Sequence, residues 1–159
     1  MKYYYLFKQG FNNYQREELL KIAKSIKLET NFNEGNFWST DIEQVNNLLP
    51  EWIKNFFHFP YRRIIFLHNK GNVLKHIDTM RDCVITFPLH FIAEEVSWWK
   101  KDKLVETLQY GIDPYLINTK IEHSVEKKGN ERYFLQLPLD GTWDENVKYF
   151  KENNFIDGY

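Results

Sequence analysis

The stretch LINTKIEHSVEKKGNERYFL, residues 116–135, holds two short runs in which apolar and polar residues alternate. Alternation with a period of two is typical of β-strands, and it predicts strands at 121–125 and 131–137. The intervening Lys127-Lys128-Gly129-Asn130 has the composition of a tight turn. The stretch is therefore expected to form a β-hairpin.

The same alternation predicts which side chains of this hairpin share a face. His123 falls on one face with Ile121 and Val125. Arg132 falls on one face with Phe134 and Gln136. Side chains of a strand point alternately to opposite faces, so each set occupies one side of the sheet. If the two strands pair across the hairpin, His123 and Arg132 line one cavity.

The chain before this hairpin continues the pattern of short strands. The further strand-like runs lie at 62–67, 73–76, 83–89, 94–99, 104–109 and 114–118. Eight short strands with turns between them predict a mainly β member of the α+β class, a double-stranded β-helix of the jelly-roll, cupin-like kind. We expect this barrel to occupy residues 61–139 of a single domain spanning 1–159.

Helices are predicted on either side of the barrel. The expected N-terminal elements are a strand at 2–8, a helix from Asn13 to about Lys27, a loop over 28–39, a short helix opened by a Thr40–Glu43 capping box, and another begun by Pro50. Residues 1–60 are thus mostly helical support for one face of a sheet. Thr142 and Glu145 form a second capping box, which predicts a C-terminal helix within 140–159.

Bulk properties exclude several classes of protein. The formal net charge of −1 gives no reason to expect a nucleic acid or a membrane surface as partner. The start of the chain does not resemble a signal peptide, and no apolar run is long enough to span a membrane. The single cysteine, Cys83, excludes an internal disulfide, which fits a reducing, cytoplasmic location. Oligomeric state is not indicated.

Four residues form a chemically suggestive set. His76 and Asp78 are separated by one residue, His123 follows Asp78 by 45 residues, and Arg132 follows His123 by nine. Two imidazoles and one carboxylate on one face of a metal, with other positions open, suit non-haem Fe(II) oxygenases. A nearby Arg suits a cosubstrate with a free carboxylate, because guanidinium and carboxylate pair through two hydrogen bonds.

Each of these residues also has a purely structural interpretation. His76 fits a solvated turn, His123 fits a core histidine with its hydrogen bonds satisfied, and Arg132 fits an exposed pair with the preceding Glu131. The combination is more specific than its parts, because the sequence has few arginines and this one opens the strand after His123.

These residues resemble the aspartyl/asparaginyl β-hydroxylase and proline-hydroxylase branch of the 2-oxoglutarate/Fe(II)-dependent dioxygenases. The resemblance rests on His76-Ile77-Asp78 with Arg81 and the strand 83–89, on 116–125 with its Glu-His-x-Val segment, and on Glu131-Arg132-Tyr133-Phe134-Leu135. It covers about residues 60–139 and leaves the N-terminal third unmatched.

The resemblance implies a site and a reaction. His76, Asp78 and His123 would bind Fe(II), and Arg132 would bind the distal carboxylate of 2-oxoglutarate. With O2 such a site hydroxylates a C–H bond of a small molecule, such as an amino acid, or of a peptide residue, and releases succinate and CO2.

Three other residues are weaker candidates. Arg81 is expected to contact the 2-oxoglutarate carboxylate or an acidic substrate group, or else to pair at the surface with Asp82. Trp98 and Trp99 face opposite ways on a strand, so one can line the substrate pocket while the other packs on the helices. Core packing is the alternative for either tryptophan.

Two other functions remain open. A cupin-like β-barrel can bind a ligand without oxygen chemistry, and an Arg132 that points to solvent would favour that function. A cupin-type enzyme using zinc, manganese or nickel without a 2-oxo acid would keep the three metal ligands and have no need of Arg132.

Overall fold

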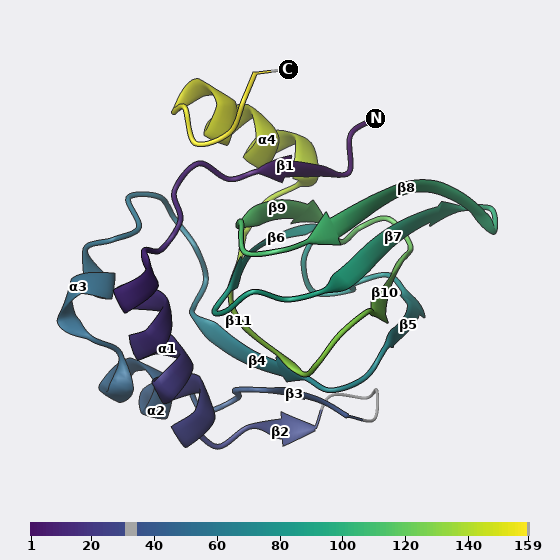
Figure 1. Cartoon of the computed structure of the whole chain (residues 1–159). Helices are drawn as coiled ribbons and strands as arrows, with labels where there is room; N and C mark the ends of the chain where they lie inside the picture. The colour runs from purple at the N-terminus through teal and green to yellow at the C-terminus, as the bar shows by residue number, and fades with distance from the viewer. Residues whose placement is uncertain (31–34, 159) are drawn as a thin grey trace.

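The computed structural model describes residues 1–30 and 35–158, which form two antiparallel β-sheets and four helices (Figure 1). The larger sheet has the strand order β1 (Tyr4–Leu6), β9 (Tyr115–Asn118), β6 (Cys83–Pro88), β11 (Arg132–Pro138), β4 (Ile65–Asn69), β3 (Asn36–Trp38), β2 (Glu29–Thr30). The smaller has the order β5 (Val73–His76), β10 (His123–Lys127), β7 (Glu94–Lys100), β8 (Lys103–Tyr110).

The two sheets pack face to face over one apolar cluster. It combines strand residues of both sheets with Tyr3 of the N-terminal segment and Ile92 of the β6–β7 connection; the strand residues are Val84, Val96, Trp98, Leu108, Tyr110, Ile117 and Phe134. This inter-sheet space is where the inward side chains of the strands meet. The predicted strands from residue 62 onward are confirmed, with ends shifted by at most three residues.

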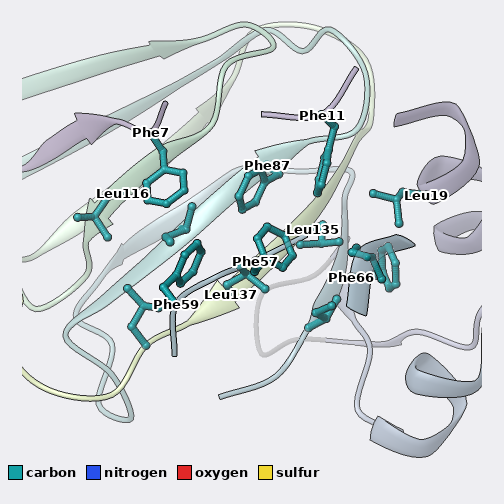
Figure 2. Packing of buried hydrophobic residues seen from close by; sticks show 14 of the residues in the cluster. Phe7, Phe11, Leu19, Phe57, Phe59, Phe66, Phe87, Leu116, Leu135 and Leu137 are labelled. Atoms are coloured by element: carbon teal, nitrogen blue, oxygen red, sulfur yellow. The ribbon is translucent and has the colours of Figure 1, made fainter. Parts of the chain in front are cut away.

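The helices cover the outer face of the larger sheet. They are α1 (Asn13–Ser25), α2 (Ile42–Leu48), α3 (Glu51–Lys54) and α4 (Trp143–Glu152). Leu19, Ile53 and Phe150 of these helices are buried against the sheet in a second, larger cluster. Figure 2 shows the aromatic part of this cluster, where Phe7, Phe57, Phe59 and Phe87 converge. Most of the aromatic side chains of this sequence are thus used to hold the helices to the sheet.

The helix starts differ from the prediction by one residue in two cases. Asn12, rather than Asn13, is the N-cap of α1, and it forms a capping box with Gln15. Asp41 caps α2 by accepting a hydrogen bond from Gln44 N–H, so the predicted Thr40–Glu43 box is wrong. The Thr142–Glu145 box at α4 is confirmed, with both of its hydrogen bonds present. No helix among the described residues is long and apolar enough to cross a membrane.

Two predictions about strands are wrong. The region 28–39, expected to be a loop, contains β2 and β3, which pair with each other and extend the larger sheet; residues 31–34 lie outside the described part of the chain. Strands β10 and β11 do not pair across the 128–131 turn. Instead β10 pairs with β5 and β7, and β11 pairs with β4 and β6, so the turn carries the chain from one sheet to the other.

Candidate active site

Strand register brings the two histidines of the predicted triad together. His123 is the first residue of β10, and its partner in the antiparallel ladder with β5 is His76. The centroids of the two imidazoles are 4.3 Å apart. Directly opposite residues in an antiparallel pair have neighbouring side chains, so a 47-residue separation in sequence becomes a contact.

Asp78 joins the histidines because the loop after β5 is anchored to the end of β9. The N–H of Asp78 donates to the carbonyl of Thr119 (3.0 Å), and the N–H of Thr119 donates to the carbonyl of Asp82 (2.9 Å). One ligand atom from each of His76, Asp78 and His123 then lies within 4.8 Å of the other two. The backbone of Thr119 therefore holds the loop that carries Asp78.

Both histidines have one ring nitrogen fixed by a backbone carbonyl. Nδ1 of His76 lies 2.8 Å from the carbonyl oxygen of Leu74, and Nδ1 of His123 lies 2.8 Å from that of Ile121. A carbonyl oxygen only accepts hydrogen bonds, so each Nδ1 carries the proton and each Nε2 is the nitrogen suited to a metal. Two Nε2 atoms and one carboxylate oxygen fit a divalent transition metal.

The two carboxylate oxygens of Asp78 have different partners. Oδ2 accepts a hydrogen bond from Nε of Arg81 (2.8 Å), while Oδ1 lies 3.2 Å from Nε2 of His76. Arg81 therefore turns Oδ1 toward the histidines. A metal bound here would meet a carboxylate whose second oxygen is already hydrogen-bonded.

The pKa values of Asp78, His76 and His123 are all shifted by their surroundings. Burial opposes ionisation of Asp78, but its hydrogen bond with His76 and the charge of Arg81 outweigh burial and hold the pKa of Asp78 below its usual range. The bond to Asp78 is the main cause of a raised pKa at His76, whereas burial, followed by the neighbouring His76, lowers the pKa of His123. An ionised carboxylate and a neutral His123 are the forms that coordinate metals.

Arg81 pairs with Asp78 of the triad, a contact that the sequence analysis did not predict. The expected surface pair with Asp82 is wrong, because Arg81 pairs with Asp78 and Asp82 pairs with Lys120 (3.3 Å). Nη2 of Arg81 also approaches Oε1 of Gln136 on β11 at 3.4 Å. The guanidinium thus joins the metal-binding loop to the inner face of the larger sheet.

Arg132 lies deep between the sheets and does not touch the triad. Its side chain is 0% exposed, and Nη1 is 2.7 Å from Oε2 of Glu94 on β7. Nε and Nη2 donate to the carbonyls of Asn69 and Gly71. The alternative of an exposed pair with Glu131 is excluded, since Glu131 pairs with His68.

Register gives the separation between Arg132 and the triad. On β7, Trp98 is the partner of His123, while Glu94, which meets Arg132, lies four residues away along the strand. Four residues of strand span about 13 Å. The triad and Arg132 therefore occupy two levels of the inter-sheet space, and Phe134 lies between Arg132 and Gln136 on the inner face of β11.

The two tryptophans occupy opposite faces of β7, as alternation predicts. Trp98 is fully buried beside His123, stacks on Tyr3 and Tyr4, and donates Nε1–H to the carbonyl of Asn118 (2.9 Å). Trp99 donates to the hydroxyl of Ser124 and lies under Lys75. The expectation that one tryptophan packs on the helices is wrong, because the helices cover the other sheet.

Sequence reasoning missed Glu94 and Tyr110. Glu94 and Tyr110 are register partners on β7 and β8, and both side chains are buried. The signal was present in the alternation, because Glu94 falls in the inward set with Val96 and Trp98. An acid in an inward set requires a buried partner, and Arg132 was the cation already predicted to face inward.

Several solved structures have a similar fold. A prolyl hydroxylase from Trichoplax adhaerens, in complex with a hypoxia-inducible-factor peptide fragment, is 12% identical, with a TM-score of 0.57 over 85% of this chain and 82% of that one. HygX from Streptomyces hygroscopicus, with nickel and 2-oxoglutarate bound, is 11% identical, with a TM-score of 0.57 over 87% and 84%.

A third similar structure is SnoN, a non-haem α-ketoglutarate-dependent epimerase from nogalamycin biosynthesis. It is 9% identical, with a TM-score of 0.57 over 84% of this chain and 76% of that one. No family model and no curated protein sequence matches the chain. At these identities the likeness concerns the fold, which is the jelly-roll fold of 2-oxoglutarate-dependent oxygenases.

Proposed function

We propose that this protein is a non-haem Fe(II)- and 2-oxoglutarate-dependent oxygenase that hydroxylates a C–H bond. The observation that carries the proposal is the triad of His76, Asp78 and His123, whose ligand atoms lie within 4.8 Å of one another while each Nδ1 is held by a carbonyl. Two imidazoles and one carboxylate, with other positions open, are the ligand set of non-haem Fe(II) oxygenases. Three solved enzymes of similar fold use or bind 2-oxoglutarate or hydroxylate prolyl residues.

The residues have distinct roles in this proposal. His76, Asp78 and His123 would hold the iron, and Arg81 would orient Asp78 through its second oxygen. Arg132 would bind the distal carboxylate of 2-oxoglutarate, for which its planar guanidinium is suited. Iron with a 2-oxo acid and O2 supplies the oxidising chemistry, yielding succinate and CO2.

The substrate is proposed as a class. The structures similar to this chain include one in complex with a peptide and one of an epimerase from nogalamycin biosynthesis. Both a small molecule, such as an amino acid, and a peptide residue therefore fit as substrate. Trp98, beside His123, is the tryptophan suited to line the inner part of a substrate pocket. We also propose that the protein belongs to the aspartyl/asparaginyl β-hydroxylase and proline-hydroxylase branch. A cytoplasmic location is proposed as well, for a chain whose single thiol, Cys83, is buried and free.

The test is anaerobic addition of Fe(II) and then 2-oxoglutarate, followed by the visible charge-transfer band of the chelate. We expect a band in the native protein and in Glu51→Ala, which removes an exposed carboxylate of α3 on the outer side of the larger sheet. Asp78→Ala should lose the band, and Arg132→Lys should need at least about tenfold more 2-oxoglutarate, since an ammonium cannot make the bidentate pair.

A native protein with full Fe(II) occupancy and no band would contradict the proposal. The alternative would then be a cupin-like ligand-binding barrel. A metal enzyme without a 2-oxo acid is distinguished by Arg132→Lys, which should leave its turnover unchanged. An Arg132 that points to solvent would have favoured a ligand-binding barrel without oxygen chemistry. Arg132 is buried, so this argument for a binding protein does not apply.

A further inference from the structure

The deep end of the inter-sheet space holds an unusual group of polar atoms. Among the buried side-chain polar atoms of the described residues that lack a hydrogen-bond partner are Oε2 of Glu94 and Nη1 of Arg132. Oε2 and Nη1 are 2.7 Å apart, yet their directions do not make a hydrogen bond. Buried polar groups left in this state point to a missing ligand.

The proposed function gives this group a ligand and also creates a conflict. Arg132 is the residue proposed to bind the distal carboxylate of 2-oxoglutarate, but the carboxylate of Glu94 already faces it. Two carboxylates beside one guanidinium in a space closed to water cannot both stay ionised without a large cost, because one negative charge would lack a partner.

We propose that Glu94 is a proton-operated counter-ion of Arg132, so that the distal carboxylate of 2-oxoglutarate binds the guanidinium as Glu94 takes up one proton from water. Protonated Glu94 can then donate a hydrogen bond to the distal carboxylate. The Arg132 guanidinium keeps that carboxylate as its single anionic partner. Without cosubstrate, ionised Glu94 neutralises Arg132. This inference rests on the proposed function and adds a regulatory residue to it.

The surroundings of Glu94 make it the group that titrates. Burial raises the pKa of Glu94 to about 7, against the opposing charge of Arg132. Tyr110, across from it on β8, has a pKa raised well above its usual value by burial and stays neutral. Lys127 is the register partner of Glu94 on β10, and its Nζ–H donates to the carbonyl of Lys70. Arg132 keeps its positive charge, because a guanidinium does not lose its proton in proteins.

The test is calorimetric titration of the Fe(II) protein with 2-oxoglutarate, without oxygen, in buffers of different ionisation enthalpy. Above about pH 8 we expect uptake of about one proton per 2-oxoglutarate bound, and an affinity that falls about tenfold per pH unit. In Glu94→Gln the proton uptake should vanish and the affinity should become independent of pH. The ligand control is 2-oxobutyrate, which has no distal carboxylate and should bind without proton uptake.

The outcomes separate the inference from the function beneath it. Binding of 2-oxoglutarate to the wild type with no proton uptake, or with the same pH dependence in Glu94→Gln, overturns the inference and leaves the function standing. Absence of 2-oxoglutarate binding to both proteins, with iron bound, overturns the function and the inference together. The wild-type measurement in two buffers decides the matter even where Glu94→Gln fails to fold.

Discussion

The inter-sheet space contains the same chemical pair, an arginine and a carboxylate, in two settings. Asp78 and Arg81 are partly exposed and joined by a well-formed hydrogen bond of 2.8 Å, and the pKa of Asp78 is lowered. Glu94 and Arg132 are almost completely buried, touch at 2.7 Å without a hydrogen bond, and the pKa of Glu94 is raised. Proximity of opposite charges is common to both pairs. The pairs differ in how well the ionised carboxylate is stabilised. Burial destabilises the charged form of both carboxyl groups, and only Asp78 accepts hydrogen bonds that offset this cost.

This difference suits two tasks. A carboxylate that stays ionised over a wide pH range is suited to hold a metal, and Arg81 with His76 keeps Asp78 in that form. A carboxyl group that titrates near neutral pH is suited to respond to a second anion. Four substitutions should separate these behaviours.

The largest effect is expected from Arg132→Met, which leaves Glu94 without a cation between the two sheets. Loss of one partner of a buried pair costs about 3–5 kcal/mol of unfolding free energy, and urea denaturation at about pH 8 measures it. The loss should shrink below about pH 6, because Glu94 then becomes neutral by binding a proton. A control, Arg63→Met, removes a guanidinium that lies over Trp38 and should cost less than about 1 kcal/mol.

Combining the two changes sharpens this prediction. In Arg132→Met with Glu94→Gln, no charge remains buried, so most of the stability lost at pH 8 should return. A double variant as unstable as Arg132→Met alone would mean that the arginine acts through packing rather than charge.

The second effect concerns the pH dependence of stability. Glu94 has a folded-state pKa of about 7, above its usual 4.5, so the folded protein binds this proton more tightly than the unfolded chain. Its contribution is complete below about pH 4.5 and is lost as the pH rises through 7, a change of up to about 3 kcal/mol. Unfolding free energies measured from about pH 5 to 8 should therefore fall less steeply in Glu94→Gln than in the wild type. Glu126→Gln, at an exposed carboxylate paired with Lys128, should leave the wild-type slope unchanged.

The third effect is on metal binding. Arg81→Met removes the hydrogen bond to the outer oxygen of Asp78, and loss of such a partner weakens metal binding by about 10–100-fold. Its stability cost should stay below about 1 kcal/mol, because the pair is partly exposed. An anaerobic Fe(II) titration measures the first quantity and urea denaturation the second, with Arg63→Met as the control for both. A large loss of stability with unchanged metal affinity would reverse the roles assigned to the two arginines.

The alternation of apolar and polar residues predicts part of the site but not all of it. Alternation correctly placed His123 and Arg132 in inward sets, and a turn was expected at 127–130, one residue before the turn observed at 128–131. It could not tell that this turn joins two sheets rather than two paired strands, because both arrangements give the same local pattern. The contact of His76 with His123 depends on the pairing of β5 with β10, which a single sequence does not encode locally.

Helix boundaries show a second limit. Asn12 and Asn13 are chemically equivalent as caps, and the choice of Asn12 is made by Gln15, which completes the capping box three residues later. Glu94 shows the reverse case. Its inward position was readable, but its partner 38 residues later became evident only with the two sheets in place.

The smallest effect is expected from Gln136→Leu, at the residue that lies on β11 between the two pairs. Gln136 donates to the hydroxyl of Thr86 (3.0 Å), and its Oε1 receives only the long, 3.4 Å contact from Arg81. Its loss should cost about 1 kcal/mol of stability and weaken Fe(II) binding less than tenfold, because the shorter bond to Asp78 still orients Arg81. Arg81→Met, Gln136→Leu and their double variant form a cycle for Fe(II) affinity. A coupling below about 0.5 kcal/mol would mean that Arg81 acts through Asp78 alone. A larger coupling would mean that Arg81 also depends on its contact with Gln136 on β11.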